Sequence, residues 1–292
     1  MKKTITSSTA EAVELGNIYR QRLVEGIKGI LNHDSNIRYP HLYVYSPPGL
    51  GKTFVSTKLL DESGVKYLKV SGNTSMFAFG ISLAVIRFLN PNEKTVILVD
   101  DCDELFKDEM NCNIMKNVLD GLRCFKYEKS LQSQWSNLSD IQRAAIEIHQ
   151  TEGQMGFTVP TDNIQFIINS NFRLPTDDET MLAHEKGGSR NMLKVHRNAI
   201  RSRCRVIDIE LNSDGHFGWI AEVVQNQSGL NDFELNNDQI QEVLDFNRVN
   251  WAHLKERSIR SVQKMADLMV KYPYHYRELW TIEYLKSGAI CN

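Results

Sequence analysis

The sequence predicts an α/β protein in which a five-stranded parallel sheet is followed by an all-helical C-terminal domain. Three observations support this fold class. Five short apolar segments have the length and composition of strands. Helical patterns separate most of them, which is typical of a parallel sheet with helices on both faces. After about residue 212 helical patterns continue and no further strand is indicated.

The elements follow from the apolar spacing. Apolar residues recur on one face of a predicted helix over 11–31, and the polar stretch before Pro40 ends it. The predicted strands are 41–45, 66–70, 95–99, 164–168 and 205–209. The later helical patterns cover 216–227, 236–247 and 250–271. We therefore expect an N-terminal helical segment (1–38), an α/β domain (39–211) and a helical lid domain (212–292).

One link between strands is unusually long. Residues 122–162 connect the third and fourth strands, with a helical pattern at 139–149 and a turn or hairpin pattern at 153–160. A link of this length usually carries function or a partner contact. Its basic and aromatic residues could meet DNA or a protein, although three acids weaken the case for DNA. The basic and aromatic residues are Lys126, Lys129, Trp135 and Arg143, and the acids are Glu128, Asp140 and Glu147.

The composition restricts the class of protein. The 292 residues are 41% hydrophobic and 24% charged, which argues against global disorder or a fibrous repeat. No apolar run is long enough to cross a membrane, and no apolar stretch follows the basic start as in a secretory signal. The five cysteines lack close-spaced pairs and the eight histidines are scattered, so we expect no metal site built from these residues and a reduced, cytoplasmic setting. The net charge of −2 gives no global case for nucleic acid.

A glycine loop links the first strand to a predicted helix that begins at Phe54. The segment Ser46–Thr53 fits the P-loop pattern GxxxxGK[ST], with Ser46 in place of the first glycine. Glycines let several backbone N–H groups point at one phosphate chain, and the helix N-terminus faces the same point. We expect Lys52 to reach the β- and γ-phosphates of ATP and Thr53 to bind Mg²⁺. The predicted nucleotide contacts are Pro48, Gly49, Leu50, Gly51, Lys52, Thr53 and Phe54. A plain Gly/Pro turn is the alternative.

Acidic residues follow the third strand directly. Ligands bind at the carboxyl ends of parallel strands, which is where Asp100 and Asp101 are placed. We expect Asp100 to organise Mg²⁺ and Asp101 to orient the attacking water. A solvated acidic turn is the alternative.

These two segments resemble Walker A and Walker B of the AAA+ ATPases. In that family the second Walker B acid is usually glutamate, whereas Asp101 is one methylene shorter. A misplacement of about 1 Å can cost about 10²-fold in rate, so the resemblance implies nucleotide binding more firmly than fast hydrolysis. Glu104 is the fallback for the base.

The same resemblance assigns three further residues. The fourth strand ends like the sensor 1 strand of the family, which places Asn171 beside the γ-phosphate, with Asn169 as the competing choice. Ser202-Arg203-Cys204 resembles the motif of clamp-loader subunits, which makes Arg203 a finger that reaches ATP on the neighbouring subunit. Arg201 is the reserve, and the alternative is a basic face that is paired with acids or solvated.

In the helical domain, Ser258-Ile259-Arg260 resembles the sensor 2 motif. The resemblance implies that Arg260 contacts the nucleotide from the lid, with Arg257 as the alternative.

The resemblance implies an oligomeric, Mg²⁺-dependent ATPase that works as a ring or open ring of five to seven subunits, a range that includes a hexamer. The clamp-loader-like motif favours remodelling of DNA in replication, recombination or repair. The segment Phe77-Ala78-Phe79-Gly80 is loosely like a polypeptide-threading loop and favours a protein substrate, unless both phenylalanines are core residues. The shorter Asp101 leaves open a nucleotide-dependent assembly switch with weak hydrolysis. A P-loop kinase with a small substrate is the last alternative, and it would need no trans arginine.

Overall fold

The computed structural model describes residues 5, 7–32, 40–120, 123–151, 155–186, 188–226 and 229–287. The chain divides into two compact units, each with its own internal contacts. The sheet unit comprises Glu25–Ser46 and Thr53–Asp208, and the helical unit comprises Met1–Val24, Pro47–Lys52 and Ile209–Asn292. This division differs from the predicted domains at two points. The helical unit takes the glycine loop and the first part of the N-terminal helix.

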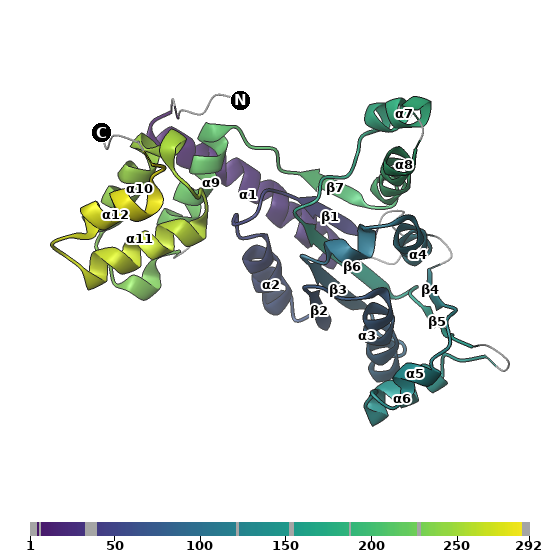
Figure 1. Cartoon of the computed structure of the whole chain (residues 1–292). Helices are drawn as coiled ribbons and strands as arrows, with labels where there is room; N and C mark the ends of the chain where they lie inside the picture. The colour runs from purple at the N-terminus through teal and green to yellow at the C-terminus, as the bar shows by residue number, and fades with distance from the viewer. Residues whose placement is uncertain are drawn as a thin grey trace. The chain divides into compact units, whose positions relative to one another are not determined.

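A five-stranded parallel sheet forms the centre of the sheet unit, as predicted (Figure 1). The strand order is β2-β3-β6-β1-β7. Their bounds are β1 Leu42–Tyr45, β2 Tyr67–Ser71, β3 Thr95–Asp100, β6 Ile164–Ser170 and β7 Arg205–Asp208. Every residue of β3 and β6 is buried, because these neighbouring strands are covered on both faces. The registers place Asp100 opposite Asn169 at the carboxyl end of the sheet.

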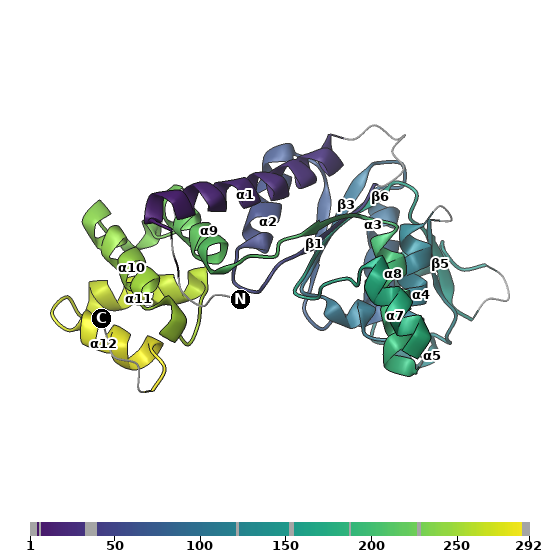
Figure 2. The ribbon, with the colours of Figure 1, turned by 90° about the horizontal axis from the view of Figure 1, so that it is seen from above.

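Helices cover the two faces of this sheet. Figure 2 shows α2 on one face, with α3 and α4 on the other. Gly26, in the C-terminal part of α1, packs closely against Ile207 of β7 and Leu42 of β1. The bounds are α1 Thr9–Leu31, α2 Lys52–Ser63, α3 Met76–Leu89, α4 Glu109–Leu119, α7 Asp177–Lys186 and α8 Ser189–Arg201. The short 3-10 helix η1 (Asp103–Phe106) follows β3.

The part of the long link between β3 and β6 that follows α4 packs against α3 and α4, and its buried residues join the core of the sheet unit. Strands β4 (Cys124–Tyr127) and β5 (Phe157–Pro160) pair antiparallel. Between them lie α5 (Gln132–Trp135) and α6 (Asp140–Glu147), the latter within the predicted helix. The predicted hairpin pattern ends in β5, and its residues 153 and 154 lie outside the described part of the chain.

The helical unit contains α9 (Ser213–Asn226), α10 (Asn237–Val249), α11 (Ile259–Lys271) and α12 (Tyr276–Tyr284). It also contains the 3-10 turns η2 (Asn231–Phe233) and η3 (Trp251–His253). The prediction of one helix over 250–271 is wrong, because the chain leaves helical geometry after η3 and α11 begins only at Ile259. A capping box fixes that start, in which the Ser258 hydroxyl accepts from the Ser261 N–H.

Helix α1 contacts α9 at glycines. A Cβ on Gly218 would lie 1.9 Å from the Ala12 carbonyl oxygen, and one on Gly16 would lie 2.2 Å from that of Gly218. Only glycine permits this approach of the two backbones. Across the described ranges of the chain, no helix has both the length and the apolar character that a membrane crossing requires.

Candidate functional site

The glycine loop has the backbone conformation that a phosphate-binding loop needs. Gly49 and Gly51 have left-handed φ angles of 80° and 76°. Ser46 is fully buried and is not among the described residues with positive φ, so serine is accommodated in place of glycine. Helix α2 begins at Lys52, two residues earlier than predicted, which leaves its first N–H groups open to an anion.

The loop is held by residues of the helical unit. The Trp219 indole Nε1 donates to the Leu50 carbonyl at 2.5 Å, and the Ile259 N–H donates to the Gly49 carbonyl at 3.1 Å. A Cβ on Gly49 would lie 2.6 Å from the Ser258 Cβ, so the loop and the start of α11 are in close contact. Both hydrogen bonds use carbonyl oxygens of the loop and not its N–H groups.

The side chains of the predicted nucleotide-binding residues differ in exposure. Leu50 and Lys52 are buried, and Lys52 Nζ donates to the Pro47 carbonyl at 3.4 Å. Phe54 is 54% exposed and Pro48 is exposed. A lysine ammonium that donates to a carbonyl oxygen can also donate to phosphate oxygens.

Asp100 is the centre of a polar cluster in the sheet unit. It is buried at the last position of β3, and the Thr53 hydroxyl donates to its Oδ1 at 2.7 Å. Lys69 Nζ lies 3.1 Å from Asp100 Oδ2, and Asn169 Nδ2 donates to Oδ1 at 3.3 Å. The structure therefore brings together both predicted magnesium-binding residues.

Asp101 has a left-handed backbone, with φ of 53°, which is uncommon for a residue with a Cβ. Its side chain is exposed, and Asn171 Nδ2 donates to Asp101 Oδ1 at 2.9 Å. A strained backbone at this place suggests a functional constraint. The structure distinguishes the two candidates for the sensor 1 residue. Asn169 contacts the buried carboxylate of Asp100, and Asn171 contacts the exposed carboxylate of Asp101. The fallback base Glu104 forms an ion pair with Lys107.

The predicted finger arginines are both paired with acids. Arg203 donates from Nε and Nη2 to Asp120 Oδ2 at 3.0 and 2.6 Å. Arg201 Nη1 donates to Asp208 Oδ2 at 2.8 Å. At both positions the geometry therefore shows the alternative, a basic face that is paired with acids.

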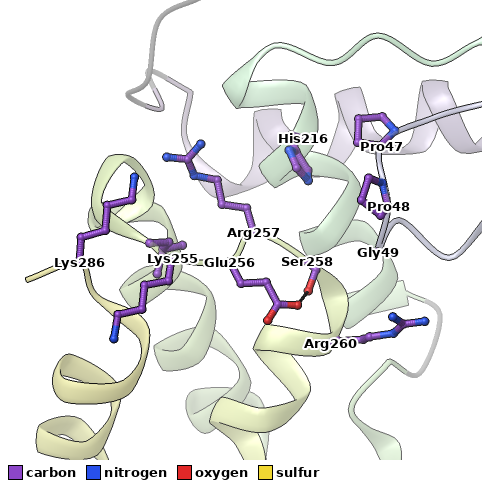
Figure 3. A pocket seen from close by; sticks show the side chains of 11 residues that line it. Pro47, Pro48, Gly49, His216, Lys255, Glu256, Arg257, Ser258, Arg260 and Lys286 are labelled. Carbon is purple, nitrogen blue, oxygen red and sulfur yellow. Dashed lines mark hydrogen bonds between the residues drawn. The ribbon is translucent and has the colours of Figure 1, made fainter. Parts of the chain in front are cut away.

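A cavity of about 380 Å³ lies within the helical unit (Figure 3). The loop residues Pro47, Pro48 and Gly49 line it together with Arg260. The other lining residues are His216, Leu254, Lys255, Glu256, Arg257, Ser258 and Lys286. Four lysines and arginines and one acid thus line the cavity, and that acid, Glu256, contacts Ser258 and Lys264. The excess of positive charge suits an anion.

The alternative to Arg260 has structural partners. Arg257 donates from Nε to the Trp251 carbonyl at 2.8 Å and from Nη2 to the Ala252 carbonyl at 3.1 Å. Arg260 is exposed in the first turn of α11. Burial lowers the pKa of His216 to about 4, so that this cavity residue is neutral at pH 7. Arg260 is therefore the better placed cation for a ligand.

The phenylalanines of the loosely loop-like segment are at the start of α3. Ser75 caps this helix, with its hydroxyl accepting from the Ala78 N–H at 3.2 Å. Phe79 is fully buried against Phe125 and Phe166, whereas Phe77 is half-buried against Tyr127. Phe79 is thus a core residue. The other candidate contacts of the long link are mixed, since Lys126 and Lys129 are exposed but Arg143 pairs with Asp140.

Sequence reasoning missed several residues around the site. Lys69 and Ser56 belong to the cluster around Asp100 and Asn169, and Asp120 and Asp208 bind the two arginines. The pairing of Ser71 with Asp100 brings β2 to this edge, so knowledge of the strand order would have indicated Lys69.

The residues present fit a magnesium ion bound with a nucleotide. A hydroxyl and a carboxylate, Thr53 and Asp100, already lie at hydrogen-bond distance, and oxygen ligands of this kind are what Mg²⁺ prefers. The ion usually keeps several waters and takes one or two carboxylates with substrate phosphates, so a larger ligand set is not required. Within the described ranges, no group of three or more His, Cys, Asp or Glu side chains could hold a metal by itself.

Comparison with known proteins gives one family. Residues 42–131 match the family described as "ATPase family associated with various cellular activities (AAA)". A solved structure of a RuvB point mutant from Thermotoga maritima is similar at 13% identity and a TM-score of 0.44. That comparison covers 91% of this chain and 64% of the RuvB chain, so this chain spans less than two thirds of that protein. The search of curated proteins gives no match.

Proposed function

We propose that this protein binds ATP with Mg²⁺ and hydrolyses it as an oligomer, because residues 42–131 match the AAA family of ATPases. The observation that carries the proposal is the 2.7 Å hydrogen bond between Thr53 and Asp100. It joins the residue after the P-loop lysine to the acid at the end of β3. A hydroxyl and a carboxylate in this arrangement are the protein ligands that P-loop ATPases supply to nucleotide-bound magnesium.

Binding rests on the glycine loop and the lid cavity. The N–H groups from Gly49 to Thr53 and the Lys52 ammonium bind the phosphates, with Pro48, Leu50 and Phe54 shaping the loop. Arg260 approaches the phosphates from the lid, in a cavity that it shares with Pro48 and Gly49. When bound through Thr53 and Asp100, Mg²⁺ neutralises phosphate charge.

Hydrolysis requires a positioned water. Asp101 accepts the water's proton or orients the water, and Asn171 holds the Asp101 carboxylate through its amide. The hydrogen bond fixes the direction of a side chain that is one methylene shorter than the family's usual glutamate. Arg203 of one subunit stabilises the developing charge on ATP bound to the next, which can contribute about 10³–10⁵ in rate.

The proposed biological work is the remodelling of a macromolecule by a cytoplasmic ring or open ring of five to seven subunits. DNA in replication, recombination or repair is the first candidate, on the Ser202-Arg203-Cys204 motif. A protein substrate is the second candidate, because Phe77 remains partly exposed at the start of α3. The burial of Phe79 leaves one aromatic side chain, not two, for such a contact.

The test is ATP binding and steady-state hydrolysis over a range of protein concentrations, with and without single- and double-stranded DNA. The Lys52→Ala variant is the blank and should bind no ATP. A rate per subunit that rises with concentration supports the trans finger, and a further rise with DNA supports the first substrate. Normal ATP binding by Lys52→Ala would refute the site assignment. Bound ATP without turnover at any concentration would make the protein an assembly switch.

A further inference from the structure

The guanidinium of Arg203 is engaged within its own subunit. Two of its nitrogens donate to one Asp120 oxygen, at 3.0 and 2.6 Å. Nη1 donates to the Ala199 carbonyl at 2.7 Å and approaches the Ser202 hydroxyl at 3.4 Å. An arginine has five N–H donors, and these contacts occupy four of them.

A finger in this state cannot present two parallel donors to a phosphate. The bidentate grip that makes arginine effective uses the same Nε and Nη2 donors that Asp120 holds. The Arg203 side chain is 24% exposed and that of Asp120 is 49% exposed, so the pair lies at the surface, where a neighbouring subunit's phosphate could reach it. A carboxylate and a phosphate oxygen are alternative partners for one cation.

Asp120 lies at the C-terminal end of α4. It is the C-cap residue of α4, with extended backbone angles, and its carbonyl accepts from the Arg123 N–H at 3.0 Å. Helix α4 begins just after η1, the short helix that follows the acidic end of β3. The Asp120 carboxylate thus lies at the C-terminal end of α4, and the N-terminal end of this helix is only eight residues after Asp101 in the sequence.

The helix that precedes Arg203 is anchored at the same acidic edge. Arg197 of α8 donates from Nε to the Phe106 carbonyl at 2.9 Å, and its guanidinium lies 3.9 Å from the centre of the Phe172 ring. Phe106 ends η1 and Phe172 follows Asn171. Helices α4 and α8 lie side by side in both views (Figures 1 and 2). The ion pair therefore joins the C-terminal ends of α4 and α8.

We propose that Asp120 is a positioning residue that holds Arg203 in a resting position in the isolated subunit and gives it up to the phosphate of a neighbour. This inference rests on the proposed function, since it needs a trans arginine. It adds a competitor to the site, because assembly must replace a carboxylate by a phosphate before the finger acts. Turnover by dilute protein is thereby suppressed.

The test is the concentration dependence of ATP hydrolysis in Asp120→Asn, with Asp120→Ser as a second variant should the first misfold. The asparagine keeps the size of the side chain and removes its charge. Exposed ion pairs of this kind contribute little, so we expect the protein concentration at half-maximal turnover to fall about two- to fivefold. Asp208→Asn is the matched control, because it breaks the 2.8 Å pair of Arg201 in the same way and should leave that concentration unchanged.

The first results that would overturn the inference come from the single variants. They are a loss of turnover in Asp120→Asn like that of Arg203→Ala, an unchanged half-maximal concentration, or an equal effect of Asp208→Asn. A gain that persists in Asp120→Asn/Arg203→Ala would also exclude it, since no finger is left to release.

A second readout separates this inference from the proposed function. The Nε–H of Arg203 can be followed by NMR in the dilute wild-type protein and in Asp120→Asn. If this proton exchanges with water slowly in the wild type and faster in the variant, Asp120 restrains Arg203. Equal exchange rates would refute this. If the wild type hydrolyses no more ATP than Lys52→Ala, the proposed function fails, while the exchange rates still decide whether Asp120 restrains Arg203.

Discussion

The substitution Gly49→Ala tests whether the glycine loop depends on its contact with the start of α11. Gly49 has φ of 80°, and an added Cβ would lie 2.6 Å from the Ser258 Cβ. The left-handed conformation costs a residue with a Cβ about 1–2 kcal/mol. Forcing a methyl group into a packed position costs about 1–3 kcal/mol more. We therefore expect the free energy of unfolding of the helical unit to fall by about 2–5 kcal/mol.

Two other glycines supply controls for the separate contributions. Gly64 has φ of 66° with nothing within 4 Å of an added Cβ, so Gly64→Ala measures the conformational cost alone. Gly51 has φ of 76°, and its nearest atom, Ile259 Cδ1, would be at an ordinary contact distance of 3.5 Å. Each of these variants should lose about 1–2 kcal/mol.

The assays are urea unfolding followed by circular dichroism and titration with Mg-ATP. Gly49→Ala should be less stable than both controls and should bind ATP more weakly, because the loop must move away from Ser258. Gly64→Ala should bind ATP like the wild type. If Gly49→Ala costs no more than Gly64→Ala and binds ATP normally, the loop is not held by this contact and the reasoning is refuted.

Three further outcomes are expected. Asp101→Asn should retain ATP binding and lose turnover, measured as phosphate release, whereas Glu104→Gln should keep it; the reverse result would move the base to Glu104. Arg260→Ala should mainly weaken ATP binding, measured by titration. Arg257→Ala should mainly lower stability, because Arg257 donates to two backbone carbonyls. Burial lowers the pKa of His41 to about 3, so the folded protein keeps this ring neutral while the unfolded chain takes up a proton near pH 6.5. Stability of the sheet unit should therefore decline as the pH falls from about 6.5 towards 3, and the decline should be smaller in His41→Gln; identical urea midpoints for the two proteins at pH 5 would exclude this.

The sequence alone was sufficient for the strands of the sheet and for the loop after the first strand. Each signal is local, since an apolar run, a glycine loop and a helix follow one another within about twenty residues. The same holds for Asp100 and Asp101, because side chains directly after a central parallel strand must lie at its carboxyl end. The helical patterns after residue 212 were also local, but the prediction of one unbroken helix over 250–271 was wrong. The turn before Ser258 has no glycine or proline to mark it.

The tertiary structure decided which distant side chains meet. Lys69 reaches Asp100 because β2 pairs with β3, and Arg203 reaches Asp120 across 83 positions because α8 packs on α4. It also placed the glycine loop with the helical unit, through Trp219 and Ile259. Such contacts depend on strand order, register and helix packing, and these are set by the burial of the whole apolar surface and not by any local run of residues.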